Sequence, residues 1–375
     1  MKKNKSICMY SIDNVIGEKT GGVKRFFELT NYFIEEGYEV FLVSKDSIDD
    51  MKKMNINGKT LKITSDKMYG LNVIKQNKEI FKFIKEKNFD KVVVFDIRAA
   101  ISLAIYNIKN INLFLRQDLL SYKKIQLESQ KINGIKRFIT LRLLLFSEFL
   151  CLKKSSKIIV QCKYDLDQLC IRHKFLKSKI INNTSIQINN VNPSWIENNK
   201  KNIDSNNSKY DLVFVGNFNN IRKGHNILLK AIEELYNENI IIKVAVIGDG
   251  LELEKYKKMY KKFDNIVFLG RIKNPASLIV NSKLSIVPSY ADSCPNTVLE
   301  SLYLNVPVIG SNRGGIPEIL NNNDWLFDLN TVSLKNAIKK YLSEEWNEKI
   351  KKEQKERKKE LEFNWSEKIR NILEK

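Results

Sequence analysis

The first half of the chain begins with the pattern of a strand, a loop, a helix and a second strand. Residues 6–12 form a short apolar run typical of a buried strand. Gly21 and Gly22 follow, and apolar residues then recur at a spacing near 3.6 over 23–36, which predicts a helix. The run at 39–44 completes a βαβ unit, which indicates parallel strands. Further strands are predicted at 91–96, 111–116 and 156–161.

The same alternation begins again after a polar stretch. Residues 197–209 are charged or polar with almost no apolar side chain, which is typical of a linker. Helices are predicted at 225–237 and 251–262. The strands of this half are predicted at 211–216, 243–250, 265–270, 284–289 and 306–311. The pattern predicts an α/β chain of two doubly wound, Rossmann-like domains, at 1–190 and 210–355, joined by a linker at 191–209.

Three strand ends in the second half carry residues suited to an anionic ligand. Open α/β sheets bind ligands at the carboxyl ends of their strands, where glycines allow close approach and cations and helix starts attract phosphate. Each loop alone is compatible with an ordinary turn or a solvated basic pair, but their recurrence in one sheet favours a site. The residues are Gly216, Asn217, Arg222 and Lys223 in the first loop, Gly248 and Asp249 in the second, and residues 289–300 in the third.

The third loop is the most specific. Pro295 suits the start of a helix, which would leave the N–H groups of the next three residues, Asn296, Thr297 and Val298, free to bind an anion. Glu300 follows about one turn later and can accept hydrogen bonds from sugar hydroxyls. Asp292 precedes it by eight positions. This loop therefore combines donors for a phosphate with acceptors for a sugar.

Residues 288–320 resemble the signature of retaining glycosyltransferases of family 4, which have the GT-B fold. The shared pattern is an acidic residue, seven positions, a glutamate, a Pro-Val strand and a closing Gly-Gly-x-x-Glu. Residues 211–232 resemble the phosphate loop of that family, with Asn217 where an arginine is usual. Asp292 stands where glutamate is commoner. The resemblance implies two domains facing a cleft and a closing helix at 356–375 that packs back on the first domain.

The resemblance implies a role for each matching position. Arg222 and Lys223 would hold the diphosphate, Glu300 the donor ribose, and Asp292 the transferred sugar. The implied catalytic residues are Asp292, Glu300 and Asp118. The implied donor-binding residues are Gly21, Gly22, Gly216, Asn217, Arg222, Lys223, Gly248, Asp249, Arg271, Ile272, Pro295, Asn296, Thr297, Val298 and Glu300. No cofactor and no metal is expected, and the donor would be a UDP- or GDP-sugar.

The first domain departs from the family pattern. A histidine, alone or followed by aspartate, often stands near the donor sugar there, whereas this chain reads Leu115-Arg116-Gln117-Asp118. Asp118 is the candidate for that position, and Asp96 lies at another strand end. Asp165-Leu166-Asp167 is a DxD string, a metal site in another glycosyltransferase fold, but its place at a predicted helix start favours capping.

The charge of the chain adds one more candidate surface. The net charge is +21, and the first 190 residues hold 35 Lys and Arg against 19 Asp and Glu. Residues 123–179 alone hold 14 against 4, with five apolar residues of one predicted helix among them. Such a segment suits an anionic membrane surface, although packing on the domain's own sheet is the alternative. The apolar residues are Phe138, Leu141, Leu144, Leu145 and Phe149.

The remaining features narrow the expected function. We find no secretory signal pattern, and five cysteines without a CxxC pair indicate reduced thiols, so the expected location is the cytoplasm, with the inner face of the cell membrane as a further site. We expect a retaining glycosyltransferase that moves a hexose-type sugar to a glycan or lipid-linked acceptor. The alternative is a non-catalytic sugar-nucleotide-binding protein or a nucleic-acid-binding protein on the same fold. Nucleic acid is not an expected partner, because the residues between the basic side chains of 123–179 are mostly aliphatic rather than aromatic.

Overall fold

The computed structural model describes residues 5–16, 21–63, 69–132, 134–191, 195, 198–199 and 209–375. Contacts between residues divide the chain into two compact units, which we call unit 1 and unit 2. Most of the linker expected at 191–209 lies outside the described residues. Unit 1 comprises Met1–Leu120, Phe138–Ile188 and Asn364–Lys375, and unit 2 comprises Ser121–Arg137 and Asn189–Phe363.

Unit 1 is built on a parallel sheet that has seven strands within the described ranges, in the order β3-β2-β1-β4-β5-β6-β7. Every residue of β5 is buried, as expected for a parallel strand covered by helices on both faces. The strands are β1 (Ser6–Tyr10), β2 (Glu39–Ser44), β3 (Asn57–Thr60), β4 (Lys91–Phe95), β5 (Ile111–Leu115), β6 (Lys157–Val160) and β7 (Thr184–Ile186).

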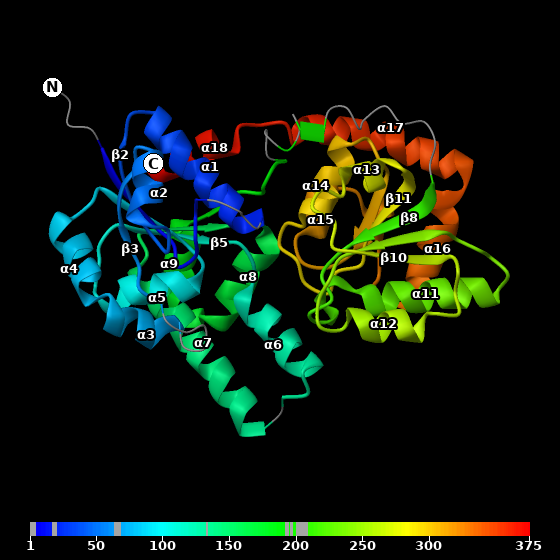
Figure 1. The fold of residues 1–375 in the computed structure, drawn as a ribbon, viewed down its shortest axis with the longest axis horizontal. Helices are drawn as coiled ribbons and strands as arrows, with labels where there is room; N and C mark the ends of the chain where they lie inside the picture. The colour runs from blue at the N-terminus through cyan, green and yellow to red at the C-terminus, as the bar shows by residue number, and fades with distance from the viewer. Residues whose placement is uncertain are drawn as a thin grey trace. The chain divides into compact units, whose positions relative to one another are not determined.

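Helices cover this sheet, and the last helix of the chain belongs to the same unit. In Figure 1, α18 (red) lies beside α1 (blue). Trp365 of α18 is buried against Phe114, with the ring centroids 5.7 Å apart, and beneath the guanidinium of Arg25. The helices are α1 (Gly21–Glu35), α2 (Ile48–Lys53), α3 (Tyr69–Gln76), α4 (Lys78–Lys87), α5 (Ile97–Ile105), α7 (Gly134–Lys154, apart from its first four residues), α8 (Lys163–Arg172), η1 (Lys174–Leu176), α9 (Lys177–Asn183) and α18 (Trp365–Glu374).

Unit 2 is built on a second parallel sheet, with six strands within the described ranges in the order β10-β9-β8-β11-β12-β13. Its central strand β8 places Leu212, Val213 and Phe214 in the core. The strands are β8 (Tyr210–Val215), β9 (Val244–Ile247), β10 (Ile266–Gly270), β11 (Ser282–Val287), β12 (Val308–Ser311) and β13 (Leu326–Phe327).

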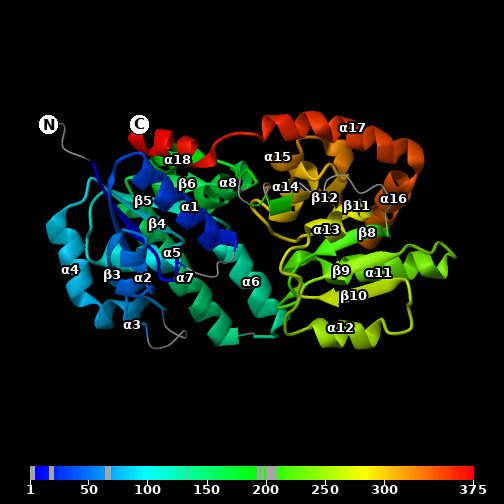
Figure 2. The ribbon, with the colours of Figure 1, turned by 45° about the horizontal axis from the view of Figure 1, so that its top comes forward.

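Helices cover both faces of the second sheet, as right-handed crossovers between parallel strands require. Figure 2 shows α11 and α12 on one face and α14 and α15 on the other. The helices of unit 2 are α6 (Leu119–Ser129, apart from its first two residues), η3 (Ile221–Lys223), α11 (His225–Asn237), α12 (Leu253–Met259), α13 (Ala276–Val280), α14 (Asn296–Tyr303), α15 (Ile316–Leu320), η4 (Asn323–Trp325), α16 (Thr331–Leu342) and α17 (Glu344–Glu360).

The strand orders place a ligand crevice in each unit. In both sheets the chain first winds in one direction from the central strand and then returns to wind in the other, so the order reverses beside β1 and β4 in unit 1 and beside β8 and β11 in unit 2. Ligands of doubly wound sheets bind at this reversal, outside the carboxyl ends of the strands. The expectation of two doubly wound Rossmann-like domains is confirmed.

Two local expectations from the sequence are wrong. The helix at the DxD string begins earlier than expected, because α8 starts at Lys163 with Cys162 as its N-cap, so Asp165 lies within the first turn rather than at the cap. Of the apolar residues assigned to an outward stripe of α7, Phe138 is exposed and the other four are partly buried. The exposed apolar side chains of α7 are Ile135, Phe138, Ile139, Leu143 and Phe146. Among the described residues, no helix has both the length and the apolarity needed to cross a bilayer.

Candidate functional site

The loops after β8 and β11 bring two cations onto one carboxylate in unit 2. Lys223 Nζ lies 2.5 Å from Asp292 Oδ2, and Arg222 Nη1 lies 3.1 Å from the same oxygen. Arg222 also donates to the carbonyl of Ala291 at 3.0 Å. Asn220 begins the short helix η3 by accepting from the N–H of Arg222, which fixes the direction of the basic pair. The structure therefore joins residues that are 69 and 70 positions apart in the sequence.

Burial sets the protonation behaviour of this cluster. Desolvation lowers the pKa of Lys223, and the neighbouring Arg222 lowers it further, against the opposing effect of Asp292. Burial alone would raise the pKa of Asp292, but the charges of Lys223 and Arg222 outweigh it and hold that pKa below its usual value. Asp292 is thus ionised at neutral pH, and a second anion would stabilise the buried ammonium.

Glycines allow the loops of this cluster to pack closely. Gly224 has φ +76°, and a Cβ there would overlap the carbonyl of Pro288. A Cβ on Gly216 would meet Lys223 Cβ at 2.9 Å. Gly314 has φ +59° and lies against the backbone of Asp292, whose carbonyl accepts from Gly315 at 2.9 Å. The closing Gly-Gly element of the sequence signature therefore supports the loop that carries Asp292.

Helix α14 begins beside this cluster. Pro295 is its N-cap, and Glu300 lies half-buried in the helix. Its charge opposes, in small part, the lowering of the pKa of Lys223 that burial causes. The sequence expectation of three free N–H groups is wrong in one respect. The N–H of Val298 donates to the carbonyl of Pro295 at 3.1 Å, because the first turn is tight. Asn296 and Thr297 remain the candidates for anion binding at this helix start.

The other expected donor residues of unit 2 lie on neighbouring strand ends. Gly248 has φ +146° and packs against the backbone of Gly216, so the ends of β8 and β9 touch. Asn217 is partly buried, and Asp249 is exposed, with its backbone carbonyl accepting from the N–H of Phe218. Arg271 and Ile272 follow β10 and are exposed.

Asp118 has a different setting from the one expected. It forms an ion pair with Arg172 at 3.0 Å, and that guanidinium also binds Glu148. His173 Nε2 completes the network at 2.7 Å from Glu148. All four side chains are largely or fully buried. Removing one partner of such a network leaves an uncompensated buried charge, so a variant of Asp118 would disturb the packing of unit 1, and its catalytic role stays a prediction.

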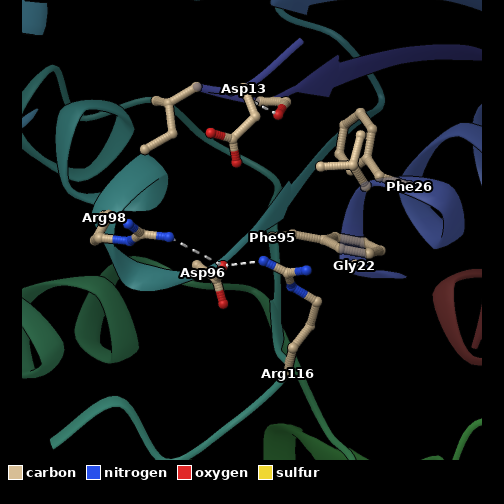
Figure 3. Close-up of a pocket in the computed structure, with 10 residues that line it drawn as sticks. Asp13, Gly22, Phe26, Phe95, Asp96, Arg98 and Arg116 are labelled. Atoms are coloured by element: carbon tan, nitrogen blue, oxygen red, sulfur yellow. Dashed lines mark hydrogen bonds and ion pairs between the residues drawn. The ribbon is translucent and has the colours of Figure 1, made fainter. Parts of the chain in front are cut away.

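Unit 1 holds a second polar site that the sequence reasoning noted only in part. Figure 3 shows Asp96, at the end of β4, between the guanidinium groups of Arg98 and Arg116. Arg116 directly follows β5 and was not selected as a site residue. A Cβ on Gly22 would overlap the Arg116 guanidinium, so the glycine leaves room for this arginine. The signal available in the sequence was a charged residue directly after a fully buried strand.

The ring contacts of His225 and the ion pair of the DxD string do not involve these clusters. His225 is fully buried between Phe218 and Tyr256, with ring centroids at 4.3 and 4.6 Å. Asp167 forms an exposed ion pair with Lys163 one turn earlier in α8. In the described part of the chain, no group of three His, Cys, Asp or Glu side chains is arranged to hold a metal ion.

Comparison with known proteins finds a family match in the second half of the chain. The family described as "Glycosyl transferases group 1" matches residues 196–360. Protein CapJ of Staphylococcus aureus is 32% identical over 138 residues, which are 35% of this chain and 34% of CapJ. N-acetyl-alpha-D-glucosaminyl L-malate synthase of Bacillus anthracis is 29% identical over 128 residues, or 33% of each chain. The chain thus matches about a third of the length of these two relatives.

Solved structures extend the likeness to the whole chain. Sucrose-phosphate synthase of Thermosynechococcus elongatus superposes with a TM-score of 0.72 at 17% identity, covering 99% of this chain and 96% of that one. HepE of Anabaena, solved with UDP and glucose, gives a TM-score of 0.67 at 15% identity and covers 99% of each chain. Residues 196–360 therefore match the family of group 1 glycosyl transferases, and the chain as a whole has the GT-B fold of two Rossmann-like domains.

Proposed function

We propose that this chain is a retaining glycosyltransferase that moves a hexose-type sugar from a UDP- or GDP-sugar to a glycan or lipid-linked acceptor. The observation that carries the proposal is the pairing of Arg222 and Lys223 with Asp292 at the strand-order reversal of unit 2. Two cations share a single carboxylate oxygen there, beside the start of α14. Anabaena HepE, which has the same fold, was solved with UDP and with UDP-glucose.

The electrostatics of the cluster support a diphosphate as its ligand. A buried lysine whose pKa is lowered gains from an added anion, and arginine and lysine are the usual partners of phosphate oxygens. A diphosphate bound to Arg222 and Lys223 would compete with Asp292 for both cations. Asp292 would then be free to accept hydrogen bonds from the hydroxyls of the transferred sugar. Half-buried Glu300 would accept from the ribose of the nucleotide.

The proposed reaction needs no nucleophile from the protein. The bond between the anomeric carbon and the diphosphate oxygen breaks, and a bond from the acceptor oxygen forms on the same face of the sugar. The acceptor proton passes to the departing diphosphate oxygen, so the charges and atoms balance. The protein's part is to neutralise the charge that develops on the diphosphate, which is the role proposed for Arg222, Lys223 and the N–H groups of Asn296 and Thr297.

We further propose that α7 docks on an anionic membrane, in keeping with a lipid-linked acceptor and the synthesis of bacterial surface glycans. The support is a single exposed face of α7 on which apolar residues recur at spacings of three and four. Arg142 lies on the same face, with its guanidinium 5.1 Å from the Phe138 ring centroid. Such a face can enter the headgroup region while neighbouring basic residues contact anionic lipid. The apolar residues are Ile135, Phe138, Ile139, Leu143 and Phe146.

A panel of sugar nucleotides tests the catalytic proposal. The full chain is incubated with UDP- and GDP-hexoses, with and without glycan and lipid-linked acceptors, and the released nucleotide is measured. The expected result is acceptor-dependent or hydrolytic release of UDP or GDP from one donor, with NMR showing the donor's anomeric configuration in the product. Binding with thermal stabilisation but no release from any donor would instead favour a non-catalytic sugar-nucleotide-binding protein.

A further inference from the structure

Arg222 is held by contacts to both its backbone and its side chain. Its N–H donates to the Asn220 side chain at 3.0 Å, and its carbonyl accepts from the N–H of Tyr290 at 2.8 Å. Its Nη1 donates to the carbonyl of Ala291 and to the carboxylate of Asp292. Only 12% of the side chain is exposed. The guanidinium therefore has a defined position among the loops of unit 2.

The aromatic ring of Tyr122 makes a further contact with this guanidinium. Tyr122 is a half-buried residue of α6, and the guanidinium carbon of Arg222 lies over its ring, 5.4 Å from the centroid. This distance is within the ~6 Å over which a cation is attracted to the face of an aromatic ring. Both residues belong to unit 2, because Ser121–Arg137 groups with that unit. The contact joins distant parts of the sequence, so the sequence reasoning did not select Tyr122.

The ring of Tyr122 and the carboxylate of Asp292 hold Arg222 in different ways. Asp292 is shared between Arg222 and Lys223, and a bound anion would compete with it for both cations. An aromatic ring attracts a guanidinium without cancelling its positive charge. It also shields the guanidinium from water, which strengthens the attraction between that charge and an anion. Tyr122 can therefore hold Arg222 and leave its charge available to a ligand.

We propose that Tyr122 is a positioning residue of the diphosphate site, which keeps the Arg222 guanidinium in place when a diphosphate replaces Asp292 as its partner. This inference rests on the proposed function, because the proposed function assigns Arg222 to the diphosphate. A carboxylate at position 122 would also hold Arg222, but it would repel the ligand. An aromatic ring meets both requirements, since it attracts the cation and carries no negative charge.

The test measures the binding of inorganic pyrophosphate, UDP and GDP to the full chain by isothermal titration calorimetry. The wild-type chain should bind pyrophosphate and at least one of the two nucleotides. Tyr122→Leu should weaken this binding by roughly three- to thirtyfold, the range expected for a cation–aromatic contact shielded from water. Tyr122→Phe keeps the ring and should recover most of the affinity. Tyr122→Met, a second variant without a ring, should show the same loss and replaces Tyr122→Leu if that variant does not fold.

A double-mutant cycle shows whether Tyr122 acts through Arg222. Arg222→Gln removes the guanidinium, so adding Tyr122→Leu to it should lower the affinity for the bound nucleotide by no more than about twofold. If Tyr122→Leu instead keeps its full effect in the Arg222→Gln background, the ring contacts the ligand or supports the fold, and Tyr122 is not a positioning residue.

Trp346→Leu is the matched control. Trp346 is also half-buried in unit 2, and its ring lies 4.1 Å from the ammonium of Lys340 and 4.5 Å from that of Lys349. The control therefore loses cation–aromatic contacts of the same kind outside the loops that carry Arg222 and Lys223, and its affinity should stay unchanged. An equal loss of affinity in Trp346→Leu would overturn the inference, because it would show that binding follows general stability, which thermal denaturation measures.

The outcomes separate this inference from the proposed function. Unchanged affinity in both Tyr122→Leu and Tyr122→Met would overturn the inference, even if the chain transfers a sugar. A wild-type chain that binds neither pyrophosphate nor UDP nor GDP would also overturn it. Coupling between Tyr122 and Arg222 in pyrophosphate binding, with no nucleotide released from any sugar nucleotide, would instead count against the proposed function and leave the inference standing.

Discussion

Lys223 Nζ and Asp292 Oδ2 lie 2.5 Å apart in unit 2, on loops that follow two neighbouring strands of the sheet. Each member of the pair is the other's main charged partner. The pKa of Asp292 is lowered despite burial because Lys223 and Arg222 are beside it. Since the pair is buried, replacing one member exposes the other to an uncompensated desolvation penalty. Mutations here therefore need a control that separates the ligand site from the fold.

Lys223→Ala is expected to lower turnover sharply, because it removes a cation assigned to the diphosphate. Loss of a charged hydrogen bond to a ligand commonly costs about 1.5–3 kcal/mol, or roughly ten- to a hundredfold in kcat/KM. Glu300→Ala should have an effect of similar size through the ribose. Turnover of the preferred sugar nucleotide is the measurement, and thermal denaturation shows whether each variant is folded. Near-wild-type turnover in both variants would refute the assignment of the site.

Gly224→Ala is expected to disrupt the same site by shifting the backbone of the loop that carries Arg222 and Lys223. Gly224 has φ +76°, and its missing Cβ leaves room for the carbonyl of Pro288. Gly37→Ala is the matched control, because Gly37 has φ +80° and nothing lies within 4 Å of an added Cβ. The control should cost about 1 kcal/mol of unfolding free energy from the backbone alone. Chemical denaturation should show a clearly larger loss for Gly224→Ala, together with weaker sugar-nucleotide binding. Equal losses of unfolding free energy in the two variants would mean that the backbone moves to avoid the overlap between the added Cβ and the Pro288 carbonyl, and that this movement costs no stability.

His225 makes stability depend on pH. Burial lowers the pKa of His225 to about 4, with a smaller contribution from Lys255, and Glu252 Oε2 lies 3.7 Å from Nε2. Because the folded pKa lies below the unfolded value near 6.5, the unfolded chain binds the proton more readily. The stabilisation is complete above pH 6.5 and declines as the pH falls toward 4, by about 2 kcal/mol at pH 5.

His225→Phe is the variant that isolates this effect, since it keeps an aromatic ring between Phe218 and Tyr256. Urea unfolding is measured at pH 7 and at pH 5 for both chains. The wild-type chain should lose about 2 kcal/mol more than the variant over this interval. A difference between the two pH values that is the same in both chains would show that His225 is not the group responsible.

The sequence predicted the sheets well where their strands are continuous apolar runs, as in β5 and β8. It missed β3, β7 and β13, since β3 is a polar edge strand, Asn57–Thr60, and β7 and β13 have three and two residues. The sequence also selected the loop that carries Asp292, because its pattern is local. The sequence placed Arg222 and Lys223 in the same site, but it did not predict their ion pairs with Asp292, which chain folding forms across 69 and 70 positions.

Unit 1 also contains contacts between distant residues that the sequence did not predict. Asp118 and Arg116 are two positions apart, and both were open to selection as site residues. The structure pairs Asp118 with Arg172 in a buried network and places Arg116 in the polar site beside Asp96. The direction in which a charged side chain points depends on partners that are distant in the sequence. Two charged residues that are close in the sequence, such as Arg116 and Asp118, can therefore belong to different clusters.

Chelation tests the expectation that catalysis needs no metal. The turnover of the preferred donor is expected to stay largely unchanged in EDTA, because the proposed charge stabilisation comes from Arg222, Lys223 and the start of α14. Release of nucleotide is followed before and after dialysis against the chelator. Complete loss of turnover that Mn²⁺ or Mg²⁺ restores would return the DxD string at Asp165 and Asp167 to consideration.

Membrane docking by α7 gives the most direct test of the acceptor class. Flotation with liposomes should carry the protein upward as the anionic lipid content rises, and high salt should weaken the effect. Phe138 and Leu143 are 60% and 62% exposed on α7, so both side chains are available to an interface. Because little of either side chain is buried, replacing them is expected to leave the stability of the fold unchanged. The double variant Phe138→Glu and Leu143→Glu should therefore lose flotation while keeping its thermal stability and its hydrolysis of the soluble donor.

Leu251→Glu is the matched control for this experiment, because Leu251 is 84% exposed and belongs to unit 2 and not to α7. The control should float as the wild-type chain does. If the protein stays in the soluble fraction at every lipid composition, α7 is not a membrane site and a soluble acceptor becomes the better proposal. If the wild-type chain is a dimer by sedimentation and the double variant a monomer, the apolar face instead joins two copies of this chain. Equal loss of flotation in the control would show that binding follows net charge rather than the face of α7.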